Sequence, residues 1–295
     1  MAENAHRLFC FGLGYSARAL IAELRHAQPG QWRFSGTARN PAAAEDGIEM
    51  QAFDGSAPLP QPGALLAADH VLISIPPDAG PPNAGGDPVL RHCADVLARH
   101  RGLKWLGYLS TTGVYGDRQG EWVDEAAAIA PSHARGQRRA DAEAGWLDLW
   151  RRHGMPVHLF RLAGIYGPGR NALVSLRQGK AHRAVKPGQV FSRIHVQDLA
   201  AVLAASMARP DPGAAYNVAD DEPAPPQDVV AHAASLLGIE PPPEVPLEQA
   251  GLSPMAQSFY LESKRVANGR IKQELGVTLR YPNYRDGLAA LLREF

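Results

Sequence analysis

Short apolar runs alternate with helical patterns through the first half of the chain. The runs are almost continuously apolar and end at turn residues; they cover residues 7–14, 32–39, 47–55, 70–77, 104–112 and 156–169. Such runs are typical of strands buried on both faces of a parallel sheet. Residues 16–27 and 88–102 carry apolar positions at helical spacing. Strands that alternate with helices predict right-handed βαβ units, so we expect an α/β fold with a Rossmann-like, doubly wound parallel sheet.

The pattern changes beyond Gly169. Residues 171–210 predict a helix, a short strand pair and another helix. The proline-rich segment 220–249 predicts one amphipathic helix, and residues 263–276 and 284–295 both have helical patterns. The proline-rich pieces separate short elements and do not resemble a long linker.

This change of pattern predicts two domains. We expect a Rossmann-like domain over residues 1–168, to which a later stretch, roughly 190–220, returns. A smaller C-terminal lobe is expected over residues 169–295. A chain of 295 residues fits one large domain with an appended lobe.

Composition narrows the class of protein. Lys and Arg number 30 and Asp and Glu number 30, so the chain lacks the basic footprint of nucleic-acid or membrane-surface binding. Cys10 and Cys93 are too few for a disulfide framework and lie in apolar segments, which favours buried thiols. The first residues contain no apolar signal region, and no run reaches the length of a membrane span. We expect a soluble, cytoplasmic protein with a small-molecule substrate, and no metal site.

A glycine-rich turn follows the first apolar run. Gly12, Gly14 and Ala17 form Gly-x-Gly-x-x-Ala, with Tyr15 and Ser16 inside it, and the next helix opens here. In this context the first glycine permits a tight turn, the second lets a pyrophosphate approach the backbone, and the small third residue allows close packing. The helix N-terminus offers N–H groups to the phosphates. The pattern predicts dinucleotide binding; a purely structural turn is the alternative.

The end of the second run indicates which dinucleotide. NAD-binding proteins usually place an acidic residue there for the ribose hydroxyls. Here the strand ends at Thr37 and Arg39, and an arginine can pair with a 2′-phosphate. We therefore expect NADP(H), with NAD as the alternative. Asp54 follows the third run and is a candidate acceptor for the adenine amino group or a simple turn residue.

The fourth run leads into a proline-rich loop. Ser74, Ile75 and Pro76 leave the strand at its carboxyl end, the edge where open α/β sheets bind ligands. We expect these residues to line the cofactor, and the rest of the loop, up to Pro88, to act as a cover.

Five motifs together resemble the extended short-chain dehydrogenase/reductase family, its NAD(P)-dependent epimerase/dehydratase-like group. They are GLGYSA, YLSTTGVYGD, VDEAAAIAP, FRLAGIYGPGR and SRIHVQDLAAVLAAS, and their order covers nearly the whole chain. The resemblance implies an NAD(P)-binding domain followed by a substrate lobe, and a homodimer as a family expectation. It also implies cofactor contacts at Leu109, Ala163, Gly164 and Ile165.

The resemblance fails at the catalytic pair. Thr111, flanked by Ser110 and Thr112, matches the hydroxyl residue that binds the substrate oxygen in this family. The family's Tyr-x-x-x-Lys is missing, and Arg135 and Arg139 stand at the matching positions. An arginine stays charged and is a poor general base, but it can hold an anion. The alternative is that the arginines of this helix face solvent.

Other polar residues complete the set of candidates. His133, Tyr115 and Tyr166 are alternative proton donors or acceptors. The resemblance implies substrate contacts at Thr112, Tyr115, Asn171 and Arg193. Lys264 and Arg265 are further candidates to reach the cleft. Asp198 is expected to cap the helix that it begins.

Three functions remain open at this point. The first is an NADP(H)-preferring oxidoreductase or epimerase/dehydratase-like enzyme with an atypical active site. The second is a non-catalytic NADP(H)-binding sensor or regulatory protein. The third is a nucleotide-sugar epimerase with a rebuilt acid/base pair.

Overall fold

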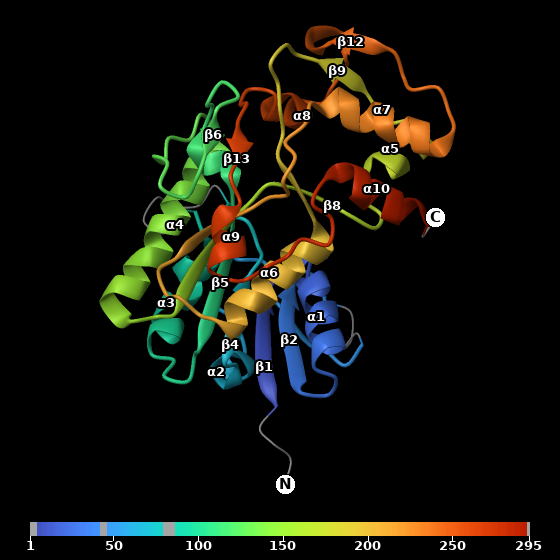
Figure 1. The fold of residues 1–295 in the computed structure, drawn as a ribbon. Helices are drawn as coiled ribbons and strands as arrows, with labels where there is room; N and C mark the ends of the chain where they lie inside the picture. Colours follow the sequence, from blue (N-terminus) through green and yellow to red (C-terminus); the bar gives the residue numbers. More distant parts are fainter. Residues whose placement is uncertain (1–4, 42–45, 79–85, 294–295) are drawn as a thin grey trace. The chain divides into compact units, whose positions relative to one another are not determined.

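The computed structural model describes residues 5–41, 46–78 and 86–293 (Figure 1). The chain divides into two compact units, each assembled from several segments. The first unit contains residues 1–111, 134–161 and 199–216, and the second contains 112–133, 162–198 and 217–295. This division interleaves more segments than the boundary predicted after residue 168, and that boundary stays a prediction. No helix in the described part of the chain is long and apolar enough to cross a membrane.

A seven-stranded sheet forms the centre of the first unit, in the order β11-β7-β5-β4-β1-β2-β3. The pairs β1–β2, β1–β4, β2–β3 and β4–β5 are parallel. The predicted α/β class with a parallel, Rossmann-like sheet is confirmed. The strands are β1 (His6–Phe11), β2 (Trp32–Ala38), β3 (Glu49–Ala52), β4 (His70–Ile73), β5 (Trp105–Thr111), β7 (Val157–Leu162) and β11 (Ala215–Val218).

Helices pack on both faces of this sheet. On one face, α3 (Pro88–Ala98) and α4 (Ala134–His153) cover a core that includes Phe11, Cys93 and Trp146. On the other, the Trp105 indole donates to Ser206 Oγ on α6 (Val196–Ala208), at 3.0 Å. The remaining helices of the unit are α1 (Tyr15–Ala27) and the short α2 (Gly63–Ala67).

The second unit is made of short elements. Its helical elements are η2 (Thr112–Tyr115), α5 (Ala172–Arg177), α7 (Pro226–Leu237), η3 (Leu247–Gln249), α8 (Pro254–Phe259), α9 (Gly269–Gln273) and α10 (Tyr284–Arg293). Its strands are β6 (Trp122–Val123), β8 (Gly164–Tyr166), β9 (Arg183–Val185), β10 (Arg193–His195), β12 (Glu244–Pro246) and β13 (Arg265–Val266). One apolar cluster joins α5, α7 and α10.

Three local predictions in this unit were wrong. The strands β9 and β10 do not pair with each other, because β9 pairs with β12 and β10 with β8. The segment predicted as helix over 263–276 begins as strand β13, which pairs with β6, so that only α9 is helical. Asp198 lies inside the first turn of α6, where its carboxylate accepts from the backbone N–H groups of Arg280 and Tyr281, at 2.7 and 3.0 Å.

Candidate functional site

The glycine-rich turn is closed by hydrogen bonds to the end of β2. Gly12 has a φ of +87°, a conformation that favours glycine. Its N–H donates to Thr37 Oγ1, and the N–H of Leu13 donates to the Thr37 carbonyl oxygen, both at 2.9 Å. Thr37 is fully buried. We therefore assign Thr37 the role of shaping the turn, in addition to its predicted place near the cofactor.

The two glycines have different surroundings. A Cβ at Gly12 would lie 2.5 Å from Ile75 Cγ2, so the loop after β4 packs against the turn only because no side chain is there. A Cβ at Gly14 would meet no described atom within 4 Å. Gly14 is exposed and stands at the N-cap of α1. The backbone at Gly14 thus faces open space, as the approach of a ligand requires.

The first turn of α1 has the character of an anion site. The N-cap residue Gly14 has no side chain to cap this helix, and the first turn contains no acidic residue. The first N–H groups of a helix have no partner within the helix and carry its positive dipole end. Ser16 and Ala17 are buried behind them, and Tyr15 is half-buried. The turn therefore offers oriented donors to a phosphate.

Residues at neighbouring strand ends border the same edge of the sheet. Arg39 is exposed immediately after β2, and Pro76 is exposed after β4, where Ser74 N–H donates to Phe11 O at 2.9 Å. Asp54 Oδ1 accepts from the hydroxyl and the N–H of Ser56, at 2.6 and 2.9 Å. These bonds lower the Asp54 pKa, which supports the simple turn role for this exposed residue. The predicted cover falls partly on residues 79–85, which lie outside the described residues.

Ser110 belongs to a buried polar network. Its hydroxyl donates to Glu143 Oε1 on α4 at 2.5 Å, and Arg161 on β7 binds the same carboxylate, with Nη2 2.9 Å from Oε2. All three residues are less than a tenth exposed. A buried charge pair needs such hydrogen bonds to offset desolvation. The hydroxyl of Ser110 is thus bonded within the protein interior, which argues against its predicted catalytic role.

Arg139 contacts the same strand from the same face of α4. Residues 135, 139 and 143 are spaced by four, so they share one helix face. Arg139 Nη1 donates to the Leu109 carbonyl oxygen and, at 3.3 Å, to Tyr108 Oη, with the guanidinium 5.7 Å from the Tyr108 ring centroid. Burial raises the Tyr108 pKa despite the charge of Arg139. Arg135 is exposed near the start of the helix, and Arg138 is half-buried.

The alternative proton carriers in the second unit differ in exposure. Tyr115 is fully buried and its hydroxyl donates to Asn217 Oδ1 at 2.7 Å, which argues against the predicted substrate contact. Tyr166 is buried, its hydroxyl donates to Asn283 O at 3.4 Å, and burial raises its pKa. His133 keeps partial exposure, with Nε2 3.4 Å from Glu262 Oε1. It remains a candidate.

Glu262 was not among the residues singled out from the sequence. Its carboxylate also lies 2.7 Å from Lys264 Nζ, and both side chains are less than a tenth exposed. The sequence signal was the proximity of Glu262 and Lys264 in ESKR. The helical interpretation of residues 263–276 placed the basic residues of that segment in solvent. This segment instead leads into β13, which pairs with β6, and the side chains of Glu262 and Lys264 are buried.

The other residues predicted to touch substrate or cofactor are held by local contacts. Asn171 caps α5, accepting from Val174 N at 3.0 Å. Arg193 Nη1 donates to the carbonyl oxygens of Phe191 and Ala224. The N–H groups of Ala163 and Gly164 donate to Val218 and Ser192, respectively. Thr111, Thr112 and Ile165 are half-buried. Thr111 belongs to the first unit and Thr112 to the second.

A second buried carboxylate was also missed. Asp220 is 1% exposed, and its Oδ2 has no hydrogen-bond partner in the described structure. Burial raises its pKa to about 8, although the nearby Arg193 opposes the shift. The sequence signal was weak, because DDEP resembles an ordinary acidic turn.

Two known proteins are similar to this chain in sequence over most of its length. No protein-family model matches the chain. A solved structure of a conserved protein of unknown function from Silicibacter pomeroyi is 52% identical, with a TM-score of 0.86, over 98% of this chain and 99% of that one. The chain belongs to the same family as this protein. Protein YeeZ from Escherichia coli K12 is 29% identical over 226 residues, which are 75% of this chain and 74% of that protein.

More distant structures show the fold. The dTDP-glucose 4,6-dehydratase of Bacillus anthracis, solved in complex with NAD, has a TM-score of 0.78 at 15% identity, over 98% of this chain and 96% of that one. The fold is therefore that of the NAD-dependent epimerases and dehydratases.

Proposed function

We propose that the protein is an NAD(P)-dependent oxidoreductase or epimerase/dehydratase-like enzyme that prefers NADP(H) and acts on a small molecule. The proposal rests chiefly on one observation, the exposed glycine N-cap of α1, with room for a ligand at Gly14, at the carboxyl end of a central parallel strand. Open α/β sheets bind their ligands at this edge. The fold shared with NAD-dependent epimerases and dehydratases supports the proposal.

The residues at this edge fit a dinucleotide. Gly14 leaves room for a phosphate, and the N–H groups of α1 would hold it. Arg39 would pair with the 2′-phosphate, while Ser74, Ile75 and Pro76 would lie along the other half of the cofactor. Leu109, Ala163, Gly164 and Ile165 are carried over from the family resemblance. Bound there, the nicotinamide would donate or accept a hydride.

The chain's own side chains would orient the substrate. Thr111 is the hydroxyl residue proposed to bind a substrate carbonyl or hydroxyl, because Ser110 is bonded to Glu143. Arg135, exposed near the start of α4, would hold an anionic group of substrate or cofactor. Arg139 stabilises the end of β5 through Leu109 and Tyr108. His133 is the proposed proton donor or acceptor, since both tyrosines considered for that role are buried.

The cofactor preference has a direct test. We expect NADPH to bind the full chain more tightly than NADH, and Arg39→Ala to weaken NADPH binding at least ~10-fold while NADH changes little. Arg33→Ala is the matched control, because Arg33 is an exposed arginine of β2, the strand that Arg39 follows. Nicotinamide fluorescence or calorimetry measures all six affinities. Equal affinities for the two cofactors, with Arg39→Ala silent, would contradict the NADP(H) preference.

A non-catalytic NADP(H)-binding protein is the second candidate function. It is favoured by the observation that Ser110 and Arg139, two predicted catalytic residues, bond to other parts of the protein. Turnover of NADPH across a panel of carbonyl compounds and sugar nucleotides separates the candidates. Turnover that falls in Thr111→Val supports the enzyme, whereas tight NADPH binding without any turnover supports the sensor.

The proposed cytoplasmic location and homodimer are separate expectations, tested by fractionation and light scattering.

A further inference from the structure

Two histidines and an aspartate meet at the amino ends of two neighbouring strands. His6 begins β1 and His70 begins β4, with Asp69 directly before it. The strands are parallel and adjacent, with Leu8 opposite His70. Side chains two residues apart share a face, so His6 and His70 lie on the same face of the sheet. The glycine-rich turn follows the other end of β1, so this cluster is separate from the proposed cofactor site.

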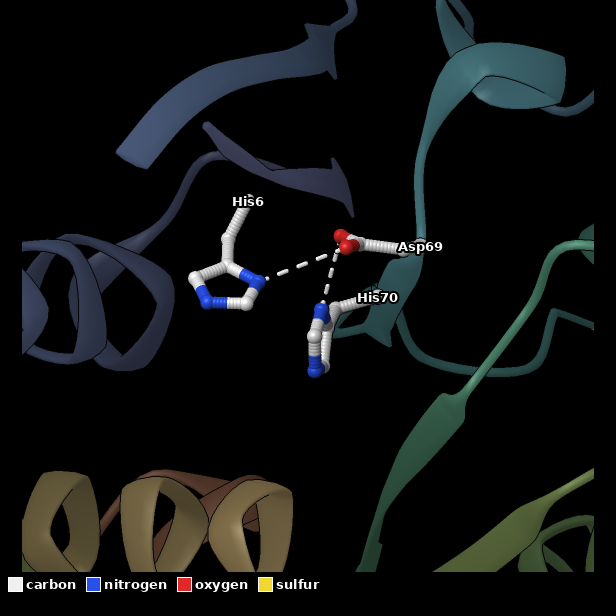
Figure 2. Close-up of side chains that lie close together, drawn as sticks. All are labelled: His6, Asp69 and His70. Carbon is white, nitrogen blue, oxygen red and sulfur yellow. Dashed lines mark hydrogen bonds and ion pairs between the residues drawn. The ribbon is translucent and has the colours of Figure 1, made fainter. Parts of the chain in front are cut away.

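The carboxylate of Asp69 lies between the two imidazoles. His70 Nδ1 is 2.8 Å from Asp69 Oδ1, and His6 Nδ1 is 3.5 Å from Oδ2 (Figure 2). One ligand atom from each residue lies within 4.8 Å of the other two. In the described part of the chain, this is the group of histidine, cysteine and acidic residues close enough to share an ion. A tetrahedral zinc site separates its ligand atoms by about 3.3 Å, so side chains whose ligand atoms lie up to 4.8 Å apart would move closer together on binding.

A backbone donor orients the Asp69 carboxylate, which lies between the two imidazoles. Arg7 N–H donates to Asp69 Oδ1 at 2.8 Å, which orients the carboxylate.

We propose that His6, Asp69 and His70 bind a divalent transition-metal ion such as Zn²⁺, with water completing the coordination. Two imidazoles and a carboxylate are a common ligand set for such ions. The ion would tie the start of β1 to the start of β4, so its role would be structural. This proposal departs from the expectation of no metal site. The cluster could not be predicted, because His6 and Asp69 are 63 residues apart and the sequence does not show the strand order that brings them together.

Lys104 supplies a variant with the opposite effect. Its Nζ lies 3.4 Å from Asp69 Oδ2, where it competes with a bound cation, and its side chain is 63% exposed. Removing this ammonium group should strengthen metal binding without disturbing the fold.

Calorimetric titration of the chelator-treated full chain with Zn²⁺ tests the proposal. We expect one Zn²⁺ per chain and a rise in melting temperature on binding. His6→Gln should weaken binding at least ~10-fold, and Lys104→Ala should tighten it severalfold. His26→Gln is the control, because His26 is an exposed histidine of α1. Circular dichroism confirms that each variant is folded. The absence of saturable Zn²⁺ binding, or unchanged binding in both His6→Gln and Lys104→Ala, would overturn the proposal.

Discussion

The glycine-rich turn and the start of α4 were both predicted to hold anions at the carboxyl edge of the sheet. The two regions differ in the donors that they present and in the partners of those donors. At the turn, the donors are backbone N–H groups that follow a glycine N-cap, which has no side chain. At α4, Arg139 and Glu143 bond to Leu109, Tyr108, Ser110 and Arg161. A pattern of backbone donors thus points to a ligand more reliably than a cluster of charged side chains, because side chains can satisfy one another.

The largest expected effect comes from breaking the network at α4. Glu143→Gln leaves the Arg161 guanidinium buried without a counter-charge, which should cost about 3–5 kcal/mol of unfolding free energy. Asp148→Asn is the control, since Asp148 is a half-exposed carboxylate on the same helix. Urea denaturation measures both. A loss below about 1 kcal/mol in Glu143→Gln would show that the network does not stabilise the sheet.

Asp220 contrasts with Glu143, because it is a buried carboxylate with one oxygen, Oδ2, that has no hydrogen-bond partner in the described structure. Its folded pKa of about 8 lies above the unfolded value, so the folded state binds the proton more tightly. Its contribution to stability is complete below about pH 4 and is lost as pH rises to about 8. Asp220→Asn should therefore recover on the order of 4 kcal/mol at pH 8.5 relative to pH 5.

Urea midpoints at these two pH values measure the effect. Asp228→Asn, an exposed acidic residue of α7, should give the same difference between the two pH values as the unaltered chain. If Asp220→Asn also leaves that difference unchanged, Asp220 is ionised in the folded protein and the account of its burial is wrong.

Arg139 should matter for folding more than for an anion. Arg139→Met keeps the apolar stem but loses the bonds to Leu109 and Tyr108, at a cost of about 1–2 kcal/mol. Arg151→Met, an exposed arginine in the last turn of α4, is the control. Thermal unfolding compares the two. An unchanged melting temperature in Arg139→Met would show that these bonds do not stabilise the fold, and would favour the anion-binding role of Arg139.

The smallest expected effect on stability is at Arg135. Because this side chain is exposed, Arg135→Ala should change unfolding free energy by less than about 0.5 kcal/mol. If Arg135 holds a substrate anion, KM should rise while the affinity for NADPH stays the same. A large loss of stability would show that Arg135 belongs to the buried network of α4.

Much of the first unit was predictable because its signals are local. Continuous apolar runs marked β1 and β5, and the glycine spacing marked the turn before α1. Non-local contacts were not predictable. Ser110 and Glu143 are 33 residues apart, and nothing in either segment shows that they bond.

The second unit was harder to predict for a related reason. Its strands β9 and β10 have only three residues each, so their partners are selected by tertiary packing and not by their own patterns. The same is true of Asp198, whose acceptor groups are used by Arg280 and Tyr281, more than eighty residues away. The sequence showed an acidic residue near the start of α6 but not which donors it meets.

Titration of the full chain and of Gly14→Val with NADPH tests the central claim most directly. A Cβ at Gly14 would meet no described atom of the protein within 4 Å, so we expect the fold to be unchanged while the approach of a phosphate is blocked. Gly63→Val, at an exposed glycine that begins α2, is the control. We predict saturable NADPH binding that falls at least ~100-fold in Gly14→Val alone, at an unchanged melting temperature. Equal binding by Gly14→Val and the unaltered chain, or no binding by either, would contradict the assignment of this turn as the cofactor site.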